Sequence, residues 1–285
     1  MIKFKWVKSD KNNPQHKQLS AEMSAYYSEW SLRVQYQTML NAIPESSDSN
    51  PVVKAVVHHI KSSYKNNLLE IGCGSGRMYQ SFIKSISGFN YTGIEVSDEV
   101  ITANRLIYPN ASWISGSVYQ LPFAENSFSA VFSNYVIEHL VFPEEGIKEM
   151  LRVLEPGGQL CLVFPDFAMS RRFPSQELGL GGGEETAKEK FKKGRIFNAL
   201  LSLLDSRFRL PYALGRIAKG ADFMINLTPR CLKFPNLVYA DIDAVYIASK
   251  QQIVNWCTQQ NLRYEFPAGV SNEFALHTFM VIYKS

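Results

Sequence analysis

Apolar runs and amphipathic stretches alternate through the middle of the chain. Short apolar runs of strand length occur at 67–71, 90–94, 111–115, 128–132 and 159–164. Helical spacing of apolar residues lies between them, at 76–86, 97–107 and 143–154. Strands that alternate with helices predict a parallel sheet covered on both faces. The pattern therefore indicates an α/β fold.

The segments on either side of this alternation have other patterns. Residues 1–18 are polar and are expected to be loosely ordered, whereas 19–43 carry apolar residues at helical spacing. The segment ESSDSNP is a polar linker, and Pro51 opens the next helix because proline suits a first helical turn. Residues 166–240 break the alternation and include a glycine-rich GLGGGEE at 179–185.

The alternation resumes towards the C-terminus. Residues 241–261 predict a helix that begins at about Ser249, and two strand-like segments follow at 262–266 and 274–283.

Three glycines follow the first strand-like run at alternate positions, in the segment LLEIGCGSG (68–76). Gly72, Gly74 and Gly76 allow a sharp turn and leave bare backbone against which a ligand can lie. The spacing differs from the dinucleotide fingerprint G-x-G-x-x-G, because Arg77 stands where its third glycine would be. A ligand-binding turn between strand and helix is the first hypothesis.

An acidic residue, Glu95, ends the next predicted strand, about 20 residues beyond the glycines. A carboxylate there is placed to accept hydrogen bonds from two ribose hydroxyls. The glycine turn and this acid together predict an adenosine-type ligand.

These motifs belong to a longer ordered set: LEIGCGSG (69–76), GIEVS (93–97), LPFAENSFSAVFSNYVIEHL (121–140) and IKEMLRVLEPGGQLCLVFP (147–165). In this order the chain resembles the class I S-adenosylmethionine-dependent methyltransferases, in the branch whose third motif reads LPF…SF…EHL. The resemblance runs from about Leu68 to Pro165.

The resemblance implies a doubly wound, Rossmann-like sheet, mostly parallel with an antiparallel last strand, plus a helical cap. The predicted parts are an N-terminal helical cap (1–50), an S-adenosylmethionine-binding core (51–165), a helical insertion or substrate cap (166–240) and the C-terminal part of the core sheet (241–285).

The resemblance also implies a set of cofactor contacts. Glu70 is expected to hold the methionine end of S-adenosylmethionine through its amino group or a bridging water, and Glu95 to hold the ribose. Ser117 stands where the family usually has an acid that bonds the adenine amino group; its hydroxyl accepts a weaker bond, and the Val118 amide can read the ring. The complete expected set is Glu70, Gly72, Cys73, Gly74, Gly76, Glu95, Val96, Ser117, Val118 and Asn134.

Two side chains are candidate catalytic residues. His139 has an ordinary pKa near 6.5, which suits a general base at neutral pH, but EHL recurs with unrelated substrates, which favours a positioning role. Asp166 follows the strand at 159–164 and lies at the same predicted sheet edge. Asn134 and Tyr135 are expected close to the transferred methyl group, and no metal site is expected.

The amino-acid composition bears on the cellular compartment that is expected for the protein. The 285 residues include four cysteines without zinc or disulfide spacing, and they indicate reduced thiols in a cytoplasmic protein. The N-terminus has no apolar segment of signal-peptide length, and no apolar run approaches the ~18 residues of a membrane span.

A basic stretch at 188–219 carries nine basic residues and two acidic ones, a local net charge of +7. Three interpretations compete: a solvated helical cap, a lid for an anionic substrate such as a nucleotide sugar, and a basic amphipathic segment on an anionic membrane surface. Nucleic-acid binding is not expected, because the basic residues lack interleaved aromatics.

The sequence therefore predicts an enzyme that transfers a methyl group from S-adenosylmethionine to an oxygen or nitrogen of a small molecule or glycan precursor. Two alternatives remain open: a non-catalytic S-adenosylmethionine-binding regulatory protein and an NAD-dependent oxidoreductase. The sequence does not predict the oligomeric state.

Overall fold

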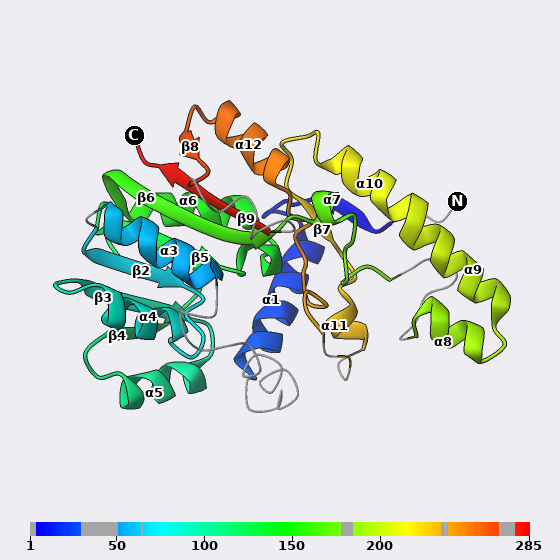
Figure 1. Cartoon of the computed structure of the whole chain (residues 1–285), viewed down its shortest axis with the longest axis horizontal. Coiled ribbons are helices and arrows are strands. Elements are labelled where there is room, and N and C mark those ends of the chain that lie inside the picture. The colour runs from blue at the N-terminus through cyan, green and yellow to red at the C-terminus, as the bar shows by residue number, and fades with distance from the viewer. Residues whose placement is uncertain are drawn as a thin grey trace.

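A computed structural model of the chain describes residues 4–29, 51–63, 65–177, 185–234, 237, 239–267 and 277–285. Its centre is a seven-stranded sheet in the order β4-β3-β2-β5-β6-β9-β8 (Figure 1). The strands are β2 (Asn67–Ile71), β3 (Asn90–Glu95), β4 (Ser112–Ser115), β5 (Phe128–Asn134), β6 (Leu154–Pro165), β8 (Arg263–Glu265) and β9 (His277–Tyr283).

The sheet is mostly parallel, with antiparallel pairing at one end. The strands from β4 to β6 pair in parallel, and β9 runs antiparallel to both β6 and β8. This confirms the predicted Rossmann-like methyltransferase sheet with its inserted antiparallel strand. β2 and β5 lie side by side although β3 and β4 come between them in the chain, so the strand order reverses there. In open α/β sheets ligands bind beyond the carboxyl ends of the strands at such a reversal.

Helices cover both faces of the sheet. They are α3 (Pro51–Ser62), α4 (Arg77–Ser85), α5 (Asp98–Ile107), α6 (Pro143–Val153) and α12 (Lys250–Gln259). The side chains of β5 alternate between the two apolar layers. Val131 packs in the layer that contains α6 and α12, and Phe132 in the layer that contains α3 and α4.

The N-terminal residues are ordered, and the expectation that residues 1–18 are loose is wrong over 4–18. β1 (Trp6–Lys8) pairs antiparallel with β7 (Met224–Asn226), and α1 (Pro14–Ser28) begins at Pro14. Proline fits this first helical turn because its missing N–H has no intrahelical partner to lose. The predicted helix 19–43 is helical as far as Ser28, and its part from residue 30 lies outside the described residues, as does the linker.

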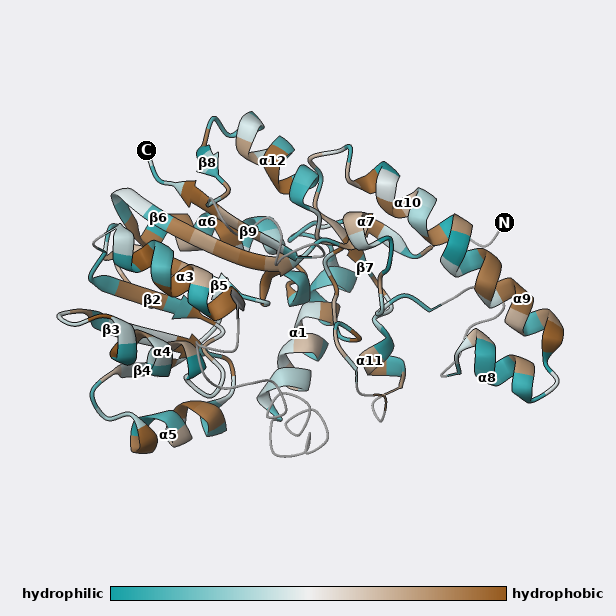
Figure 2. Ribbon diagram, viewed as in Figure 1, coloured by the Kyte–Doolittle hydropathy of each residue, from teal (hydrophilic) through white to brown (hydrophobic). Residues whose placement is uncertain are grey.

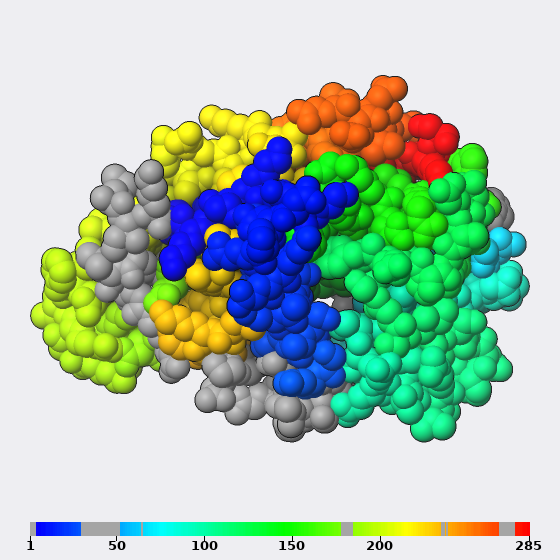
Figure 3. Space-filling view, turned by 180° about the vertical axis from the view of Figure 1, so that it is seen from behind, coloured from blue at the N-terminus to red at the C-terminus, as the bar shows by residue number. Residues whose placement is uncertain are grey.

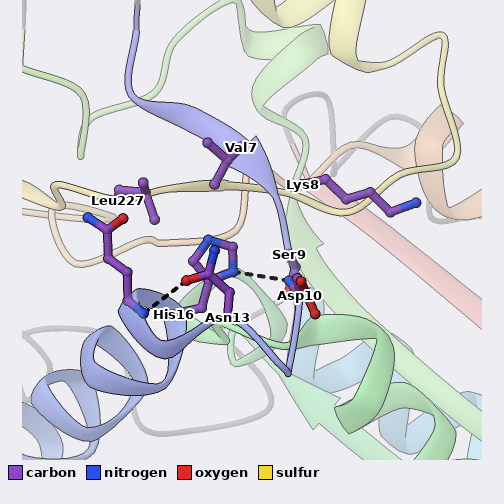
Figure 4. A pocket seen from close by; sticks show the side chains of 8 residues that line it. Val7, Lys8, Ser9, Asp10, Asn13, His16 and Leu227 are labelled. Carbon is purple, nitrogen blue, oxygen red and sulfur yellow. Dashed lines mark hydrogen bonds between the residues drawn. The ribbon is translucent and has the colours of Figure 1, made fainter.

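Local hydrogen bonds fix the start of α1, beside a small surface hollow (Figure 4). The Asn13 side chain accepts from the Gln15 amide at 2.9 Å, and His16 Nδ1 accepts from the Asp10 amide at 3.1 Å. The hollow is thus lined by side chains whose hydrogen bonds fix the start of α1.

The insertion between the core strands is largely helical, and its part 187–217 projects from the rest of the molecule as an arm (Figure 1). Its elements are α7 (Phe167–Ser170), α8 (Ala187–Lys192), α9 (Ile196–Leu204), the π-helix η4 (Asp205–Arg209), α10 (Leu210–Ile217), β7 and α11 (Arg230–Lys233). In the space-filling view α8 and α9 lie at the end opposite the cyan and teal core (Figure 3). Among the described residues, no helix has both the length and the apolar character needed to cross a membrane.

Candidate active site

A cavity of about 1080 Å³ lies at the carboxyl ends of β2, β3 and β5. Its wall includes the glycine turn after β2, Glu95 at the end of β3, and the residues that follow β5. Side chains from α1 and from residues 240–243 complete it. The cavity therefore lies at the reversal of strand order, where the fold predicts a ligand.

The glycine turn is shaped by left-handed backbone. Gly72 has φ of 69°, and a Cβ there would collide with the Val136 side chain. The amides of Gly72 and Cys73 both donate to the Ile94 carbonyl, at 2.9 and 3.1 Å, which fastens the turn to β3. Gly74, with φ of 45°, has no protein atom within 4 Å of a Cβ built on it. The backbone at Gly74 thus borders open space in the cavity.

Glu95 is joined to this turn. Its Oε2 accepts from the Gly74 amide at 3.2 Å, and its Oε1 accepts from the Val96 amide at 2.7 Å. Burial raises the pKa of Glu95, and the backbone amides that bond it act in the opposite direction. Both Glu95 and Val96 line the cavity. The carboxylate is therefore held in place by one amide of the glycine turn and by the amide of the residue that follows Glu95.

Glu70 enters the same cavity from β2. Its side chain is buried, and the Tyr91 hydroxyl donates a hydrogen bond to it. Burial raises the pKa of Glu70 well above its ordinary value. Cys73 is buried beside it, and burial likewise raises the pKa of its thiol. A cationic group placed next to Glu70 would favour its ionised form.

Most of the remaining expected cofactor contacts also line the cavity. Ser117, Val118 and Asn134 do so, and the Ser117 hydroxyl accepts from the Tyr119 amide at 3.3 Å. The buried amide atoms of Asn134 have no hydrogen-bond partner within the described part of the chain. Gly76 is the exception: it caps α4 with φ of 76°, and it is not part of the cavity wall.

A cluster of ionisable side chains forms another part of the cavity wall. His139 belongs to the short 3₁₀ helix η2 (Ile137–His139), and its Nδ1 lies 3.7 Å from Oδ1 of Asp243. The Tyr27 hydroxyl of α1 donates to Asp243 Oδ2 at 3.0 Å, and the Tyr27 ring meets the His139 ring edge-on at 5.5 Å. Segments from three distant parts of the sequence thus assemble one group.

Glu138 is the most enclosed member of this cluster. Its backbone carbonyl accepts from the amides of Val245 and Tyr246 at 2.8 and 2.9 Å, which ties η2 to the segment after Asp243. Its carboxyl oxygens are buried and have no hydrogen-bond partner among the residues described. Burial raises the pKa of Glu138 to about 8.

Neighbouring charges dominate the titration of His139. Burial alone would lower the pKa of His139, but the carboxyl groups of Asp243, Glu138 and Asp241 together raise it above its ordinary value. Burial raises the pKa of Asp241. His139 is thus a proton-binding group held next to acids in the cavity wall.

Two cavity residues adopt backbone conformations that side chains rarely take. Tyr135 has φ of 55° and Asp241 has φ of 60°. Such conformations cost about 1–3 kcal/mol and gather at functional sites. Asp241, Asp243, Tyr27 and His277 were not singled out from the sequence. The pair of acids in DID (241–243) carried a signal, but nothing in the sequence showed that this segment faces the cavity.

Asp166 lies outside the cavity, in contrast to its predicted place beside the reacting groups. Its Oδ1 accepts from the Met169 amide at 2.9 Å and so caps α7, and its Oδ2 accepts from the Lys250 amide at 3.2 Å. Both carboxylate oxygens are therefore engaged in fixing the local chain.

Comparison with known proteins indicates the class of protein domain to which the core is similar. Residues 69–162 match the family model described as a methyltransferase domain. This third of the chain is thus similar to methyltransferase domains, in agreement with the class I S-adenosylmethionine-dependent type predicted from the sequence. Within the described residues, no group of three or more His, Cys, Asp and Glu side chains is arranged to hold a metal ion.

The curated relatives match over this domain. The chain is 30% identical over 122 residues to the uncharacterized methyltransferase C1B3.06c of Schizosaccharomyces pombe, which covers 39% of this chain and 44% of that protein. It is 30% identical over 106 residues to the demethylmenaquinone methyltransferase of Chlorobaculum parvum, covering 37% of this chain and 44% of that protein. The chain thus spans less than half the length of these relatives.

Two solved structures also resemble the chain. The PH0226 protein of Pyrococcus horikoshii has a TM-score of 0.49 at 15% identity, with coverage of 82% of this chain and 90% of that chain. The S-adenosylmethionine-bound CalS10, an amino pentose methyltransferase from Micromonospora echinaspora, has a TM-score of 0.36 at 21% identity, with coverage of 39% and 49%.

Proposed function

We propose that the chain transfers a methyl group from S-adenosylmethionine to an oxygen or nitrogen atom of a small molecule or glycan precursor. The observation that carries the proposal is that two chemically different walls share one cavity. The glycine turn with Glu95 forms one wall, and the cluster of His139, Asp243 and Glu138 forms the other. At about 1080 Å³ the cavity exceeds the usual upper size of a ligand pocket, roughly 1,000 Å³, so it has room for a cofactor and an acceptor.

The first wall fits the cofactor. The open space beside Gly74 admits a ligand against the backbone, and Glu95 offers carboxylate oxygens to ribose hydroxyls. Glu70 is placed to accept from a methionine amino group, and the unpartnered amide of Asn134 is available to the same ligand. When bound, S-adenosylmethionine supplies a methyl carbon open to in-line attack.

The second wall fits the acceptor. Methyl transfer to a hydroxyl or amine releases a proton, and His139 with Asp243 is placed to take it. Tyr27 holds Asp243 by a hydrogen bond, so the acid whose charge raises the pKa of His139 is itself fixed. The chain's own contribution is to orient the acceptor, exclude water and receive this proton.

The charge of this wall bears on the acceptor class. Asp241 and Asp243 carry carboxyl groups that accept hydrogen bonds and, when ionised, repel anions, whereas the raised pKa of Glu138, about 8, keeps that carboxyl largely protonated at neutral pH. They favour an acceptor rich in hydroxyl or amino groups over the anionic substrate considered from the sequence.

The first test is calorimetric titration with S-adenosylmethionine and S-adenosylhomocysteine, with NAD as the control. Micromolar binding of the adenosyl ligands, without binding of NAD, is expected. Transfer of labelled methyl groups is then measured on amino sugars, polyols and nucleotide sugars, in the wild type and in Asp243→Asn. Failure to bind either adenosyl ligand would refute the proposal. Binding without transfer to any acceptor class would favour the non-catalytic regulatory alternative.

A further inference from the structure

In α8 and α9, the outer part of the helical arm, polar or small side chains face inward and large apolar side chains face outward, whereas α10 buries Leu210 and Leu214. Lys190 of α8 is buried, and its Nζ donates to Ser202 Oγ of α9 at 2.9 Å. The residues of α9 that face inward are small, Ala199 and Ser202. This arrangement is the inverse of an ordinary surface helix, whose apolar stripe faces the core.

Most of the large apolar side chains of the arm point to the outside. Phe197 is 70% exposed and Phe208 is 69% exposed. Four of these exposed side chains follow one another at four-residue spacing, which places neighbours on one helical face. We name this row the apolar stripe: Leu200, Leu204, Phe208 and Tyr212. Phe191, Ile196, Phe197 and Leu203 are exposed beside it. Figure 2 shows α9 as a largely brown helix at the end of the arm.

The stripe lies on a long helix. This helix continues from α9 through η4 into α10, from Ile196 to Ile217, and the stripe from Leu200 to Tyr212 takes up about 20 Å of it at 1.5 Å per residue. A contiguous exposed apolar surface marks a site for a membrane or a protein partner.

The charge around the stripe is strongly positive. Nine basic residues and two acidic ones lie between Lys188 and Lys219. Part of this charge is paired, because Asp205 pairs with Arg209, and Glu185, which precedes the stretch, pairs with Lys193 and Arg195. Lys188, Lys192 and Arg207 are exposed beside the apolar side chains.

From the inverted packing and this charge we propose that the arm, residues 187–217, docks on an anionic lipid membrane surface. The apolar stripe enters the boundary between headgroups and acyl chains, and the basic side chains contact the headgroups. Charge argues against a second copy of the chain as occupant, because two arms face to face would bring a net charge of +6 against +6. The proposal is independent of the methyl-transfer reaction, since the arm shares no residue with the cavity wall.

The test is co-sedimentation of the full chain with phosphatidylcholine vesicles that contain or lack phosphatidylglycerol. We expect binding to the anionic vesicles to be at least about tenfold tighter, and to weaken with salt. Leu200→Ser/Leu204→Ser/Phe208→Ser should lose about tenfold or more. The matched control is Leu106→Ser/Ile107→Ser on α5, where both side chains are exposed outside the arm, and it should bind as the wild type does.

A second variant tests the charge. Lys188→Gln/Lys192→Gln should lower anionic-vesicle binding by about fivefold per lysine, which corresponds to about 1 kcal/mol for each. Circular dichroism and S-adenosylmethionine binding check that each variant folds. Absence of vesicle binding, or equal binding by the stripe variant and the wild type, would overturn the proposal. Light scattering tests the alternative that the stripe is an interface between two copies of the chain. The proposal is overturned if the wild type is a dimer that does not bind vesicles and only the stripe variant is a monomer.

Discussion

His139 Nδ1 lies 3.7 Å from Asp243 Oδ1, across a junction between the core sheet and the segment that follows the helical insertion. The Tyr27 hydroxyl fixes Asp243 from a third direction. This pair gives His139 a second acidic neighbour, in addition to Glu138 of the EHL motif, whose Oε1 lies 3.9 Å from His139 Nε2. The acidic neighbours give a definite expectation for the pKa of His139, which should lie above its ordinary value.

The first prediction concerns pH. The acids near His139 raise the pKa of this residue, so the imidazole is free to accept a proton only as pH rises through that raised value. Asp243→Asn removes one of these charges and should move the acidic limb of the kcat/KM profile to lower pH. His139→Gln should abolish that limb and most of the turnover, by about 10²–10⁴-fold for a lost general base. An unchanged profile in Asp243→Asn would show that the pair does not govern the reaction.

The second prediction concerns the ribose contact. Glu95→Gln removes the charge that strengthens the hydrogen bonds to ribose hydroxyls, and charged hydrogen bonds contribute about 1.5–3 kcal/mol. S-adenosylmethionine affinity should therefore fall by about tenfold or more in calorimetry. Glu125→Gln, at an exposed carboxylate outside the cavity, is the matched control and should bind normally. Equal affinities for the two variants would refute the ribose assignment.

A third prediction separates binding from stability at Glu70. Burial raises the pKa of Glu70, so the ligand-free protein loses stability as pH rises through that raised pKa and the buried carboxyl ionises. Glu70→Gln keeps an acceptor for the Tyr91 hydroxyl and removes the charge. Thermal unfolding should show a higher Tm at alkaline pH, together with about tenfold weaker cofactor binding. A lower Tm at alkaline pH would contradict this account.

The fourth prediction contrasts two glycines. Gly72→Ala places a Cβ against Val136 in left-handed backbone and should destabilise the domain, by more than the roughly 1–2 kcal/mol of the conformation alone. Gly74→Ala meets no protein atom, so its stability loss should stay near that conformational cost. Its cofactor binding should nevertheless fall, because the methyl group enters space that the ligand needs. Denaturant unfolding and calorimetry on both variants measure the two effects; normal binding by Gly74→Ala would place the ligand elsewhere.

The core of the fold could be predicted because its signals are local. The glycine turn, Glu95 and the alternating strands of 67–164 each carry their pattern within a few residues, and the sheet has the expected arrangement. The order at the N-terminus could not be predicted in this way. Trp6–Lys8 forms a strand only because it pairs with Met224–Asn226, which lies more than two hundred residues away.

The acceptor wall escaped prediction for the same reason. Tyr27, Asp241 and Asp243 meet His139 only after η2 is tied to the 241–248 segment by the Glu138 carbonyl. In the basic stretch, the charge and the apolar content could be read from the sequence, but the side of the helix that each residue faces could not. Only the structure shows that Ser202 faces inward and Leu200 outward.

The last prediction distinguishes a capping role from a catalytic one at Asp166. Its two oxygens accept from the amides of Met169 and Lys250, so the carboxylate stabilises the start of α7 and its junction with α12. Asp166→Ala leaves these amides without their partner and should lower the free energy of unfolding by about 1–2 kcal/mol. Asp166→Asn retains an amide oxygen for the cap and should unfold close to the wild type. Because asparagine caps a helix but does not accept a proton as a base, the two roles predict opposite results for turnover. We expect kcat/KM of Asp166→Asn to equal that of the wild type; a loss of turnover in that variant at normal stability would make Asp166 a reacting group.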